Sequence, residues 1–379
     1  MESLKKLSSH IETRPADLKK AREQGRKIVG YTPGGYFPEE LALAAGAIPI
    51  CMIRGGDYAA AEHAGDYICR WIDTFCRAQI GYGTSGKDPY YSILDLLVIP
   101  ITDNHVRSIS DILDYNTGLE IFPFGVPHMK EQSAFDYYVH GLKRLKSRLE
   151  ELTGNEITDT KLKEAIDLCN QERELFKKIS LARESEQPPI SGKDFITLNH
   201  GSMLADKQTM IAILESLYSE LQKGAGNSSN GTRVLLTGST LAMGDNSVIE
   251  FIEKSGGNVV IEEFAEGIRP YWETVQPNGD PITVLADCYF TRRVPPAWFR
   301  PATEWRDFLI KLAEDFKVKG VIWYHLMFRE SYKTESYFFP EQLSKETGLP
   351  MLVVESDYDP AGIQDMQAHI DVFMQTLRR

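Results

Sequence analysis

Short apolar runs alternate with amphipathic stretches in the first third of the chain. The runs at 28–31 and 95–99 are bounded by turn residues, which predicts two buried strands. We expect a short helix at 38–45 after the first strand and a second helix at 106–113 after the other. Because strand and helix alternate, the pattern predicts a parallel sheet within residues 1–131.

The strand pattern stops at about residue 132. Val139, Leu142, Leu145 and Leu149 recur at three- and four-residue spacing, which is typical of one face of a helix. We therefore expect a helical section over 132–222, most simply a bundle that packs against the first sheet. Residues 223–232 (KGAGNSSNGT) have almost nothing to bury, and we predict that they form a linker.

Strand and helix patterns alternate again over residues 233–379. The expected strands lie at 234–236, 258–261, 321–324 and 351–354, and the expected helices at 246–255, 305–317 and 362–377. The sequence thus predicts an α/β protein with two doubly wound parallel-sheet domains, of the Rossmann or flavodoxin kind, separated by the helical section. The two sheets look like variations on one architecture.

Composition and charge exclude several classes of protein. The chain has 42 basic and 54 acidic residues, a net charge of -12, and no basic stripe, which argues against nucleic-acid binding. The chain contains no run of about 18 apolar residues, so we expect no membrane-spanning helix. The first 20 residues lack the apolar centre of a secretion signal, so we expect a cytoplasmic protein. Five cysteines with no CxxC pair indicate reduced thiols rather than disulfides.

The segment 81–88 (GYGTSGKD) is similar to two nucleotide-binding motifs. A dinucleotide loop or a P-loop needs a strand before its glycines and a helix after them, whereas here a helical stretch precedes and a strand follows. Asp88 also stands where a hydroxyl would hold magnesium. We interpret the segment as a loop without phosphate chemistry. No HExxH pair supports a zinc hydrolase, and no GxSxG supports a serine hydrolase.

Three further segments, in their order and spacing, carry a resemblance to one family. They are 67–82, with Cys69 and Cys76, then 98–107 (VIPITDNHVR) and 320–329 (GVIWYHLMFR). These segments resemble the three cysteine motifs of the 2-hydroxyacyl-CoA dehydratase and benzoyl-CoA reductase subunits, and 30–49 is similar to the family's opening strand and helix. In its length and in its departures from these motifs, the chain most resembles the beta subunits of (R)-2-hydroxyacyl-CoA dehydratases, in particular those that act on 2-hydroxyglutaryl-CoA.

The resemblance implies a fold, a reaction and partners. Family members that bind an iron-sulfur cluster hold it with cysteines from the three motifs, but Thr102 and Arg329 occupy two of those places here. Neither side chain is a soft thiolate, so we expect no cluster in this chain and no metal ligands in it. The implied partner is an alpha subunit that carries a [4Fe-4S] cluster, served by an ATP-dependent iron-sulfur activator. FMN is a further expected cofactor. The implied reaction removes water from a 2-hydroxyacyl-CoA through a ketyl radical.

Residues after the predicted strands are candidates for a site, whatever the family. Thr102, Gly238 and Arg329 each follow one such strand, and parallel sheets bind ligands at that edge. We expect Arg329 to offer a fixed positive charge there, with a surface ion pair as the alternative. A flavin phosphate is expected either at the turn 238–240, at a helix start, or at the positive charge of Arg329. The cofactor-binding candidates are Cys76, Thr102, Asp103, Gly238, Ser239, Tyr324, His325 and Arg329; no catalytic residue is assigned.

Two other functions remain open at this point. A catalytically silent scaffold would only dock the alpha subunit and would hold no cofactor. A subunit of an aromatic acyl-CoA reductase would need a cluster here, and the missing cysteines weigh against it.

Overall fold

Two four-stranded sheets form the centre of the computed structural model, which describes residues 1–224, 230–276 and 278–378. Every strand pair is parallel. The first sheet has the order β2-β1-β3-β4 and the second the order β6-β5-β7-β8. The strands are β1 Ile28–Tyr31, β2 Ile48–Cys51, β3 Leu96–Ile101, β4 Ile121–Gly125, β5 Thr232–Gly238, β6 Gly257–Glu263, β7 Gly320–Leu326 and β8 Met351–Ser356.

Helices cover both sheets. Those around the first sheet are α2 Glu39–Ala44, α3 Tyr58–His63, α4 Thr74–Ser85 and α5 Asn104–Asn116. The other helices before the second sheet are α1 Glu2–Glu23, α6 Gln132–Thr153, α7 Asp159–Leu181, α8 Gly192–Ser202 and α9 Lys207–Gln222. Those of the second half are α10 Ser247–Lys254, α11 Arg269–Trp272, α12 Pro281–Ala286, α13 Thr303–Asp315, α14 Glu330–Thr347 and α15 Ile363–Thr376. None of the helices in the described residues is long and apolar enough to cross a membrane.

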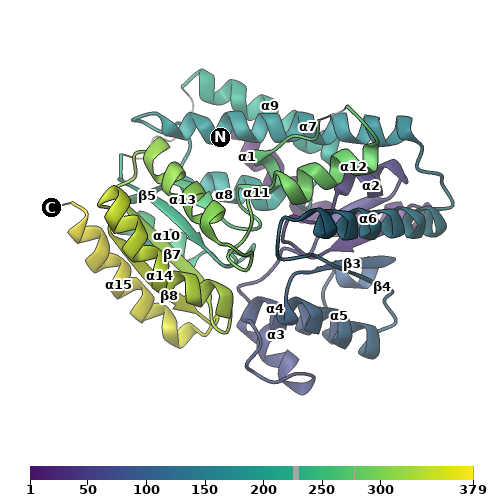
Figure 1. The fold of residues 1–379 in the computed structure, drawn as a ribbon, viewed down its shortest axis with the longest axis horizontal. Coiled ribbons are helices and arrows are strands. Elements are labelled where there is room, and N and C mark those ends of the chain that lie inside the picture. The colour runs from purple at the N-terminus through teal and green to yellow at the C-terminus, as the bar shows by residue number, and fades with distance from the viewer. Residues whose placement is uncertain (225–229, 277, 379) are drawn as a thin grey trace.

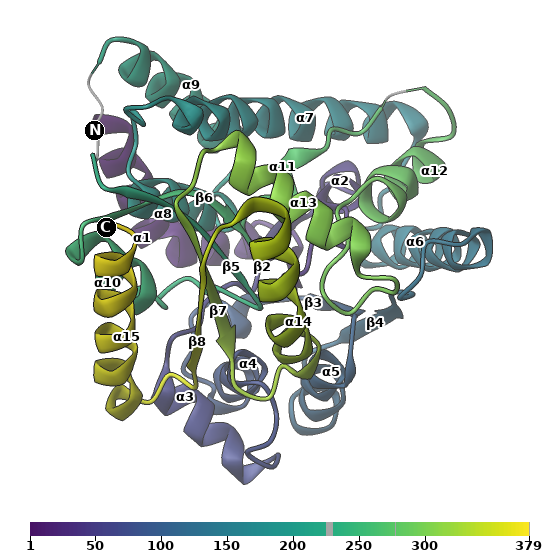
Figure 2. The ribbon, with the colours of Figure 1, turned by 60° about the vertical axis from the view of Figure 1, so that its left-hand side comes forward.

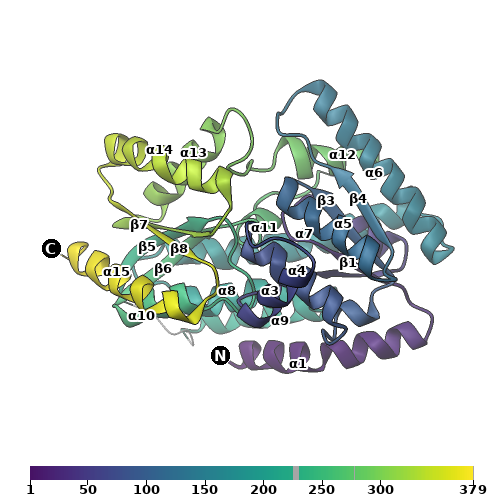
Figure 3. The same cartoon turned by 90° about the horizontal axis from the view of Figure 1, so that it is seen from below.

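The two sheets lie side by side under α7 and α9. In Figure 1 the second sheet lies on the left, the first on the right, and α7 and α9 run above them. Figure 2 shows α7 and α9 along the top, where they pack against each other, and Figure 3 shows α1 along the outer edge. Helix α1 packs against α8 and α9, and α11 and α12 from the second half pack against α7 and α6. The predicted domain limits of 131, 222 and 233 stay predictions.

Both sheets have the same topology, and the predicted α/β class is confirmed. Numbered within its own sheet, each has the strand order 2-1-3-4. In such an order the connections turn in opposite directions from the two central strands, so a crevice opens where these strands end. The crevices lie after β1 and β3 in the first sheet and after β5 and β7 in the second.

Most predicted elements occur within two residues of their expected limits, while the linker is only partly described. Residues 225–229 of the predicted linker 223–232 lie outside the described residues, and Thr232 already belongs to β5. The cysteine prediction is confirmed: Cys51, Cys76, Cys169 and Cys288 are buried free thiols, and Cys69 is an exposed one.

The interpretation of 81–88 as a loop is wrong for its first half. Gly81 and Gly83 lie inside α4, and Gly86 ends that helix in the left-handed conformation at φ +65°. A Cβ on Gly81 would lie 1.9 Å from the carbonyl oxygen of Ala60 in α3, and one on Gly83 would lie 2.5 Å from Leu113 in α5. The glycines therefore let α3, α4 and α5 approach one another closely. Their spacing is similar to that of a phosphate-binding loop, but here they allow helix packing.

Candidate functional site

The loops after β1, β3, β5 and β7 meet in a cavity between the two sheets. Its space amounts to about 460 Å³, and Thr32, Thr102, Ser239, Thr240 and Arg329 contribute to its lining. Each of these residues follows one of the central strands at the point where the strand order reverses. We call this space the motif cavity, because it gathers the carboxyl ends at which open parallel sheets bind ligands.

Three residues that stand at the family's cysteine places lie together here. The Arg329 Nη1 atom is 3.8 Å from the Cys76 Sγ atom. Nη1 donates to Asp103 Oδ1 at 3.2 Å, and Nη2 lies 3.2 Å from Asp103 Oδ2. The hydroxyl of Thr102 also donates to Asp103, at 3.1 Å. The predicted residues Cys76, Thr102, Asp103 and Arg329 therefore form one cluster, and Cys76 rather than the exposed Cys69 belongs to it.

The two carboxylates that face Arg329 also begin helices. Asp73 Oδ1 accepts from the Cys76 N–H at 2.9 Å at the start of α4, and its Oδ2 lies 3.8 Å from Arg329 Nε. Asp103 Oδ1 accepts from the N–H groups of His105 and Val106 at the start of α5. Sequence analysis missed Asp73, although an aspartate three residues before Cys76 is a helix-capping signal. Arg329 thus joins the loop after β7 to two helix starts of the first sheet.

The alternative expectation for Arg329, a surface ion pair, is wrong. Its side chain is 13% exposed and the Asp73 side chain 1%, so the pair is not a surface ion pair. Two carboxylates already face the guanidinium, and its expected role toward an anion in the cleft stays a prediction. Burial opposes the charged form, but Asp103 and Asp73 raise the pKa of Arg329 above its ordinary value. Burial, followed by Asp73, raises the pKa of the Cys76 thiol well above its usual value, so this thiol stays protonated near neutral pH.

Tyr324 and His325 lie within β7 and point to opposite sides of the sheet. The hydroxyl of Tyr324 donates to Asp245, and the side chain is fully buried. His325 Nε2 lies 3.1 Å from Glu355 Oε1, and burial lowers the pKa of the imidazole. Neither residue lines the motif cavity, so the expectation that both join Arg329 in the cleft is wrong.

The turn at Gly238 and Ser239 does not open a helix. Helix α10 begins only at Ser247, so the expected phosphate site at a helix N-terminus is wrong. A Cβ on Gly238 would lie 1.6 Å from the Tyr324 carbonyl oxygen, so glycine allows β5 and β7 to approach closely. The Ser239 hydroxyl accepts from the Leu326 N–H at 2.9 Å. Ser239 lines the motif cavity but binds β7 rather than offering an open cradle.

The residues of the motif cavity do not fit an iron-sulfur cluster. Of the three places where the family carries thiolates, only Cys76 has a thiol, and a guanidinium lies against it. Within the described ranges, no group of three or more His, Cys, Asp and Glu side chains is arranged to hold a metal ion. Where family members with a cluster have their thiolates, this chain has the ion pair of Arg329 with Asp73 and Asp103.

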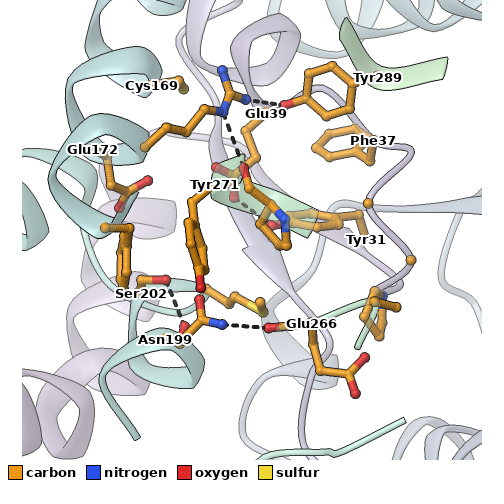
Figure 4. Close-up of a pocket in the computed structure, with 18 of the residues that line it drawn as sticks. Tyr31, Phe37, Glu39, Cys169, Glu172, Asn199, Ser202, Glu266, Tyr271 and Tyr289 are labelled. Carbon is orange, nitrogen blue, oxygen red and sulfur yellow. Dashed lines mark hydrogen bonds between the residues drawn. The ribbon is translucent and has the colours of Figure 1, made fainter. Parts of the chain in front are cut away.

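A second, larger cavity adjoins the motif cavity and shares Pro33, Gly34, Ala265 and Glu266 with it. It holds about 650 Å³ of space and lies under α7 and α8. Aromatic rings make up much of its wall (Figure 4); they belong to Tyr31, Phe37, Phe176, Tyr271 and Tyr289. We call it the aromatic cavity. Sequence analysis did not find it, because its residues come from five separate segments with no common motif.

Comparisons with known proteins agree with the arrangement of the three motifs. The family model described as "2-hydroxyglutaryl-CoA dehydratase, D-component" matches residues 35–377. A putative dehydratase subunit, YjiM, of Escherichia coli is 24% identical, with 94% of this chain and 93% of the relative covered. The (R)-phenyllactyl-CoA dehydratase beta subunit of Clostridium sporogenes is 21% identical, with 95% and 94% covered. A benzoyl-CoA reductase subunit of Thauera aromatica is 24% identical, with 73% and 72% covered.

The family match spans nearly the whole chain and includes all three motif segments. The resemblance inferred from the segments 67–82, 98–107 and 320–329 is therefore confirmed. The chain belongs to the 2-hydroxyglutaryl-CoA dehydratase D-component family.

Proposed function

We propose that the chain is a cluster-free, beta-type subunit of a 2-hydroxyacyl-CoA dehydratase. The observation that carries this proposal is the Arg329 ion pair with Asp73 and Asp103 at the family's cysteine places. The family match and the beta-subunit name of a relative aligned over nearly its full length support it. In this proposal the [4Fe-4S] cluster belongs to the alpha subunit, and an ATP-dependent iron-sulfur activator supplies the electron. FMN in the complex has no assigned residues in this chain.

The proposed reaction removes water from a 2-hydroxyacyl-CoA. The hydroxyl leaves carbon 2 and a proton leaves carbon 3, so the product is an enoyl-CoA with no net change in oxidation state. Ordinary acid-base catalysis meets a large barrier, because the carbon-3 proton is not activated by the thioester. The chain's own contribution would be to close the site against water and to fix the partner's position.

A turnover experiment tests the function itself. The chain should be produced anaerobically with a cluster-bearing subunit and activator of the family, and 2-hydroxyacyl-CoA thioesters offered with ATP and a reductant. We expect enoyl-CoA from the complex and none when this chain is omitted. Equal turnover without the chain would contradict a role in dehydration.

The chain alone should bind no [4Fe-4S] cluster. The reason is that only Cys76 remains of the motif thiols, and its pKa is raised by burial. After anaerobic reconstitution with iron and sulfide, we expect well below one iron per chain, and Cys76→Ser should not change that content. The partner subunit, reconstituted in parallel, is the positive control and should gain about four iron atoms. Stoichiometric iron in the isolated chain, lost in Cys76→Ser, would contradict the prediction.

Trp71 should contribute to partner binding. Its side chain is 64% exposed, and its ring packs edge-on against Phe328 at 5.4 Å, one residue from Arg329. Exposed tryptophans beside a functional cleft are frequent anchors of interfaces. Trp71→Ala should weaken the complex about tenfold or more, as measured by analytical ultracentrifugation. The matched control is Val372→Ala on α15, 65% exposed, which should leave the affinity within about twofold. Equal affinities for both variants would exclude this surface.

A further inference from the structure

Arg293 lies in the wall of the aromatic cavity with its charge unbalanced. The residue is 2% exposed, and it follows the π-helical turn Asp287–Thr291. None of its three guanidinium nitrogens has a hydrogen-bond partner, and no ion pair of Arg293 occurs in the described part of the chain. The guanidinium makes a cation–π contact with Tyr289, whose ring centroid is 4.5 Å from the guanidinium carbon. A buried charge without a partner is costly, so the position calls for a function.

The other two basic side chains of the aromatic cavity have partners. Arg173 Nη2 lies 2.7 Å from Glu40 Oε1 and also donates to the Tyr289 hydroxyl. Lys207 Nζ lies 2.6 Å from Glu39 and 2.6 Å from Glu172. In the described lining, Arg293 is thus the one cation whose nitrogens have no hydrogen-bond partner at all.

The acidic side chains of the cavity carry less negative charge near neutral pH than their number suggests. Glu39 and Glu172 share Lys207, and burial raises the pKa of Glu172. Burial also raises the pKa of Glu266, to about 7, so this carboxyl is partly protonated at neutral pH. No carboxylate of the described lining forms an ion pair with Arg293.

The backbone around Arg293 makes room for the guanidinium. A Cβ on Gly35 would lie 2.3 Å from Arg293 Nη1, and Gly35 has φ +79°, which disfavours other residues. A glycine thus allows the fork of donors to lie against the loop after β1. In Figure 4 the rings of Tyr31, Phe37 and Tyr289 stand on one side of the cavity and that of Tyr271 on the other.

We propose that the aromatic cavity is a binding site for a small monocarboxylate with an apolar or aromatic body, whose carboxylate pairs with Arg293. A planar guanidinium and a carboxylate match in a two-bond geometry, and the bond strengthens in a site shielded from water. The body of the ligand then lies between the aromatic rings. The proposal concerns the free acid and stands independently of the dehydratase role.

Binding of 3-phenylpropionate to the full chain tests this site. Isothermal calorimetry should detect binding by the wild type, and Arg293→Met should weaken it about tenfold to a hundredfold. The uncharged 3-phenylpropanamide should bind at least about tenfold more weakly than the acid, because it cannot form the ionic pair. Arg293→Met should melt at the same or a higher temperature without ligand, because an unbalanced buried charge has been removed.

The neighbouring Arg292 provides the matched control. Its guanidinium is already paired with Asp287 and Glu273, and Arg292 does not line the cavity. Arg292→Met should therefore bind 3-phenylpropionate within about twofold of the wild type. Arg293→Lys keeps the charge without the fork and should retain part of the affinity.

Several outcomes would overturn the proposal. They are no binding of 3-phenylpropionate by the folded wild type, equal binding of acid and amide, and unchanged affinity in Arg293→Met. Inorganic phosphate binding in place of the carboxylates would assign the cavity to another anion. Binding of 3-phenylpropionyl-CoA but not of the free acid would make it a thioester site instead. Failure of dehydratase turnover would leave this measurement unaffected.

Discussion

Arg329→Met should lower the free energy of unfolding by about 3–5 kcal/mol, because it leaves the buried Asp73 and the partly buried Asp103 without their counter-charge. The Asp73 side chain is 1% exposed, and its Oδ2 atom has no hydrogen-bond partner in the described structure, only the ion pair with Arg329. Asp103 would lose both bonds to the guanidinium. Urea denaturation at pH 7 measures the effect. The control is Arg107→Met, since Arg107 forms an exposed pair with Asp111 and should cost at most about 0.5 kcal/mol.

The pH dependence separates this ion pair from a general packing defect. Burial opposes ionisation, but Arg329 and the Val106 N–H hold the pKa of Asp103 below its ordinary value. The folded chain then binds fewer protons than the unfolded chain in acid, so the stability from Asp103 is present above about pH 4 and is lost as the pH falls through the folded pKa. The difference between wild type and Arg329→Met should therefore shrink towards pH 3. A constant difference, or one below about 1 kcal/mol at pH 7, would contradict the role of the ion pair.

Continuous apolar runs explain which strands could be predicted. Strands β3, β5 and β7 are central, and each contains a buried apolar run of three or more residues, at 96–99, 234–236 and 321–324. Strands β2 and β4 were not among the predicted strands. Both are short edge strands of the first sheet, and a proline, Pro49 or Pro123, interrupts the apolar run of each. The proline of central β3, Pro100, comes only after four apolar residues, so it did not hide that strand.

The motif cavity was predictable in outline because parallel strands end at one edge of a sheet. That rule brings Thr102 and Arg329 to the same side, and the family resemblance adds Cys76. The charge of Arg329 was misread, because its partners Asp73 and Asp103 lie more than 220 residues away in the sequence. Such a pairing between domains leaves no periodic signal.

Arg293 and its cavity had no signal at all in the sequence. The residue follows an irregular turn in a region without helical or strand periodicity, and its close neighbour Gly35 belongs to the loop after β1. A turn glycine and an arginine are common in loops, so only the fold could show that one makes room for the other. Gly81 and Gly83 were interpreted wrongly for a similar reason, because close helix packing and phosphate binding both require glycine.

Asp245→Asn should remove much of the loss of stability that we expect above pH 5. Asp245 is 6% exposed and accepts a hydrogen bond from the Tyr324 hydroxyl, and no ion pair joins it to a basic side chain in the described residues. Burial raises the pKa of this carboxyl to about 7. The adjoining loop contacts the first sheet's domain, since the Gly55 N–H donates to the Met243 carbonyl at 2.9 Å. Ionised Asp245 should therefore weaken the contact between the two halves.

The sign follows from the direction of the shift. Because the folded pKa of Asp245 is raised, the folded chain binds more protons than the unfolded chain between about pH 4 and pH 7. The stability that protonated Asp245 contributes therefore falls over that range, and this contribution is absent at higher pH. A shift of this size corresponds to about 3 kcal/mol between pH 5 and pH 8. An amide cannot ionise but can still accept from Tyr324, so Asp245→Asn should keep the stability of the protonated state at pH 8.

Glu266, whose pKa burial also raises to about 7, should leave a smaller slope in the variant. Urea midpoints at pH 5, 6.5 and 8 measure both slopes, with Asp111→Asn, an exposed carboxylate, as the control that should follow the wild type. Parallel curves for wild type and Asp245→Asn would show that Asp245 is ionised in the folded chain throughout, and the buried Tyr324–Asp245 bond would then be one between a phenol and a carboxylate.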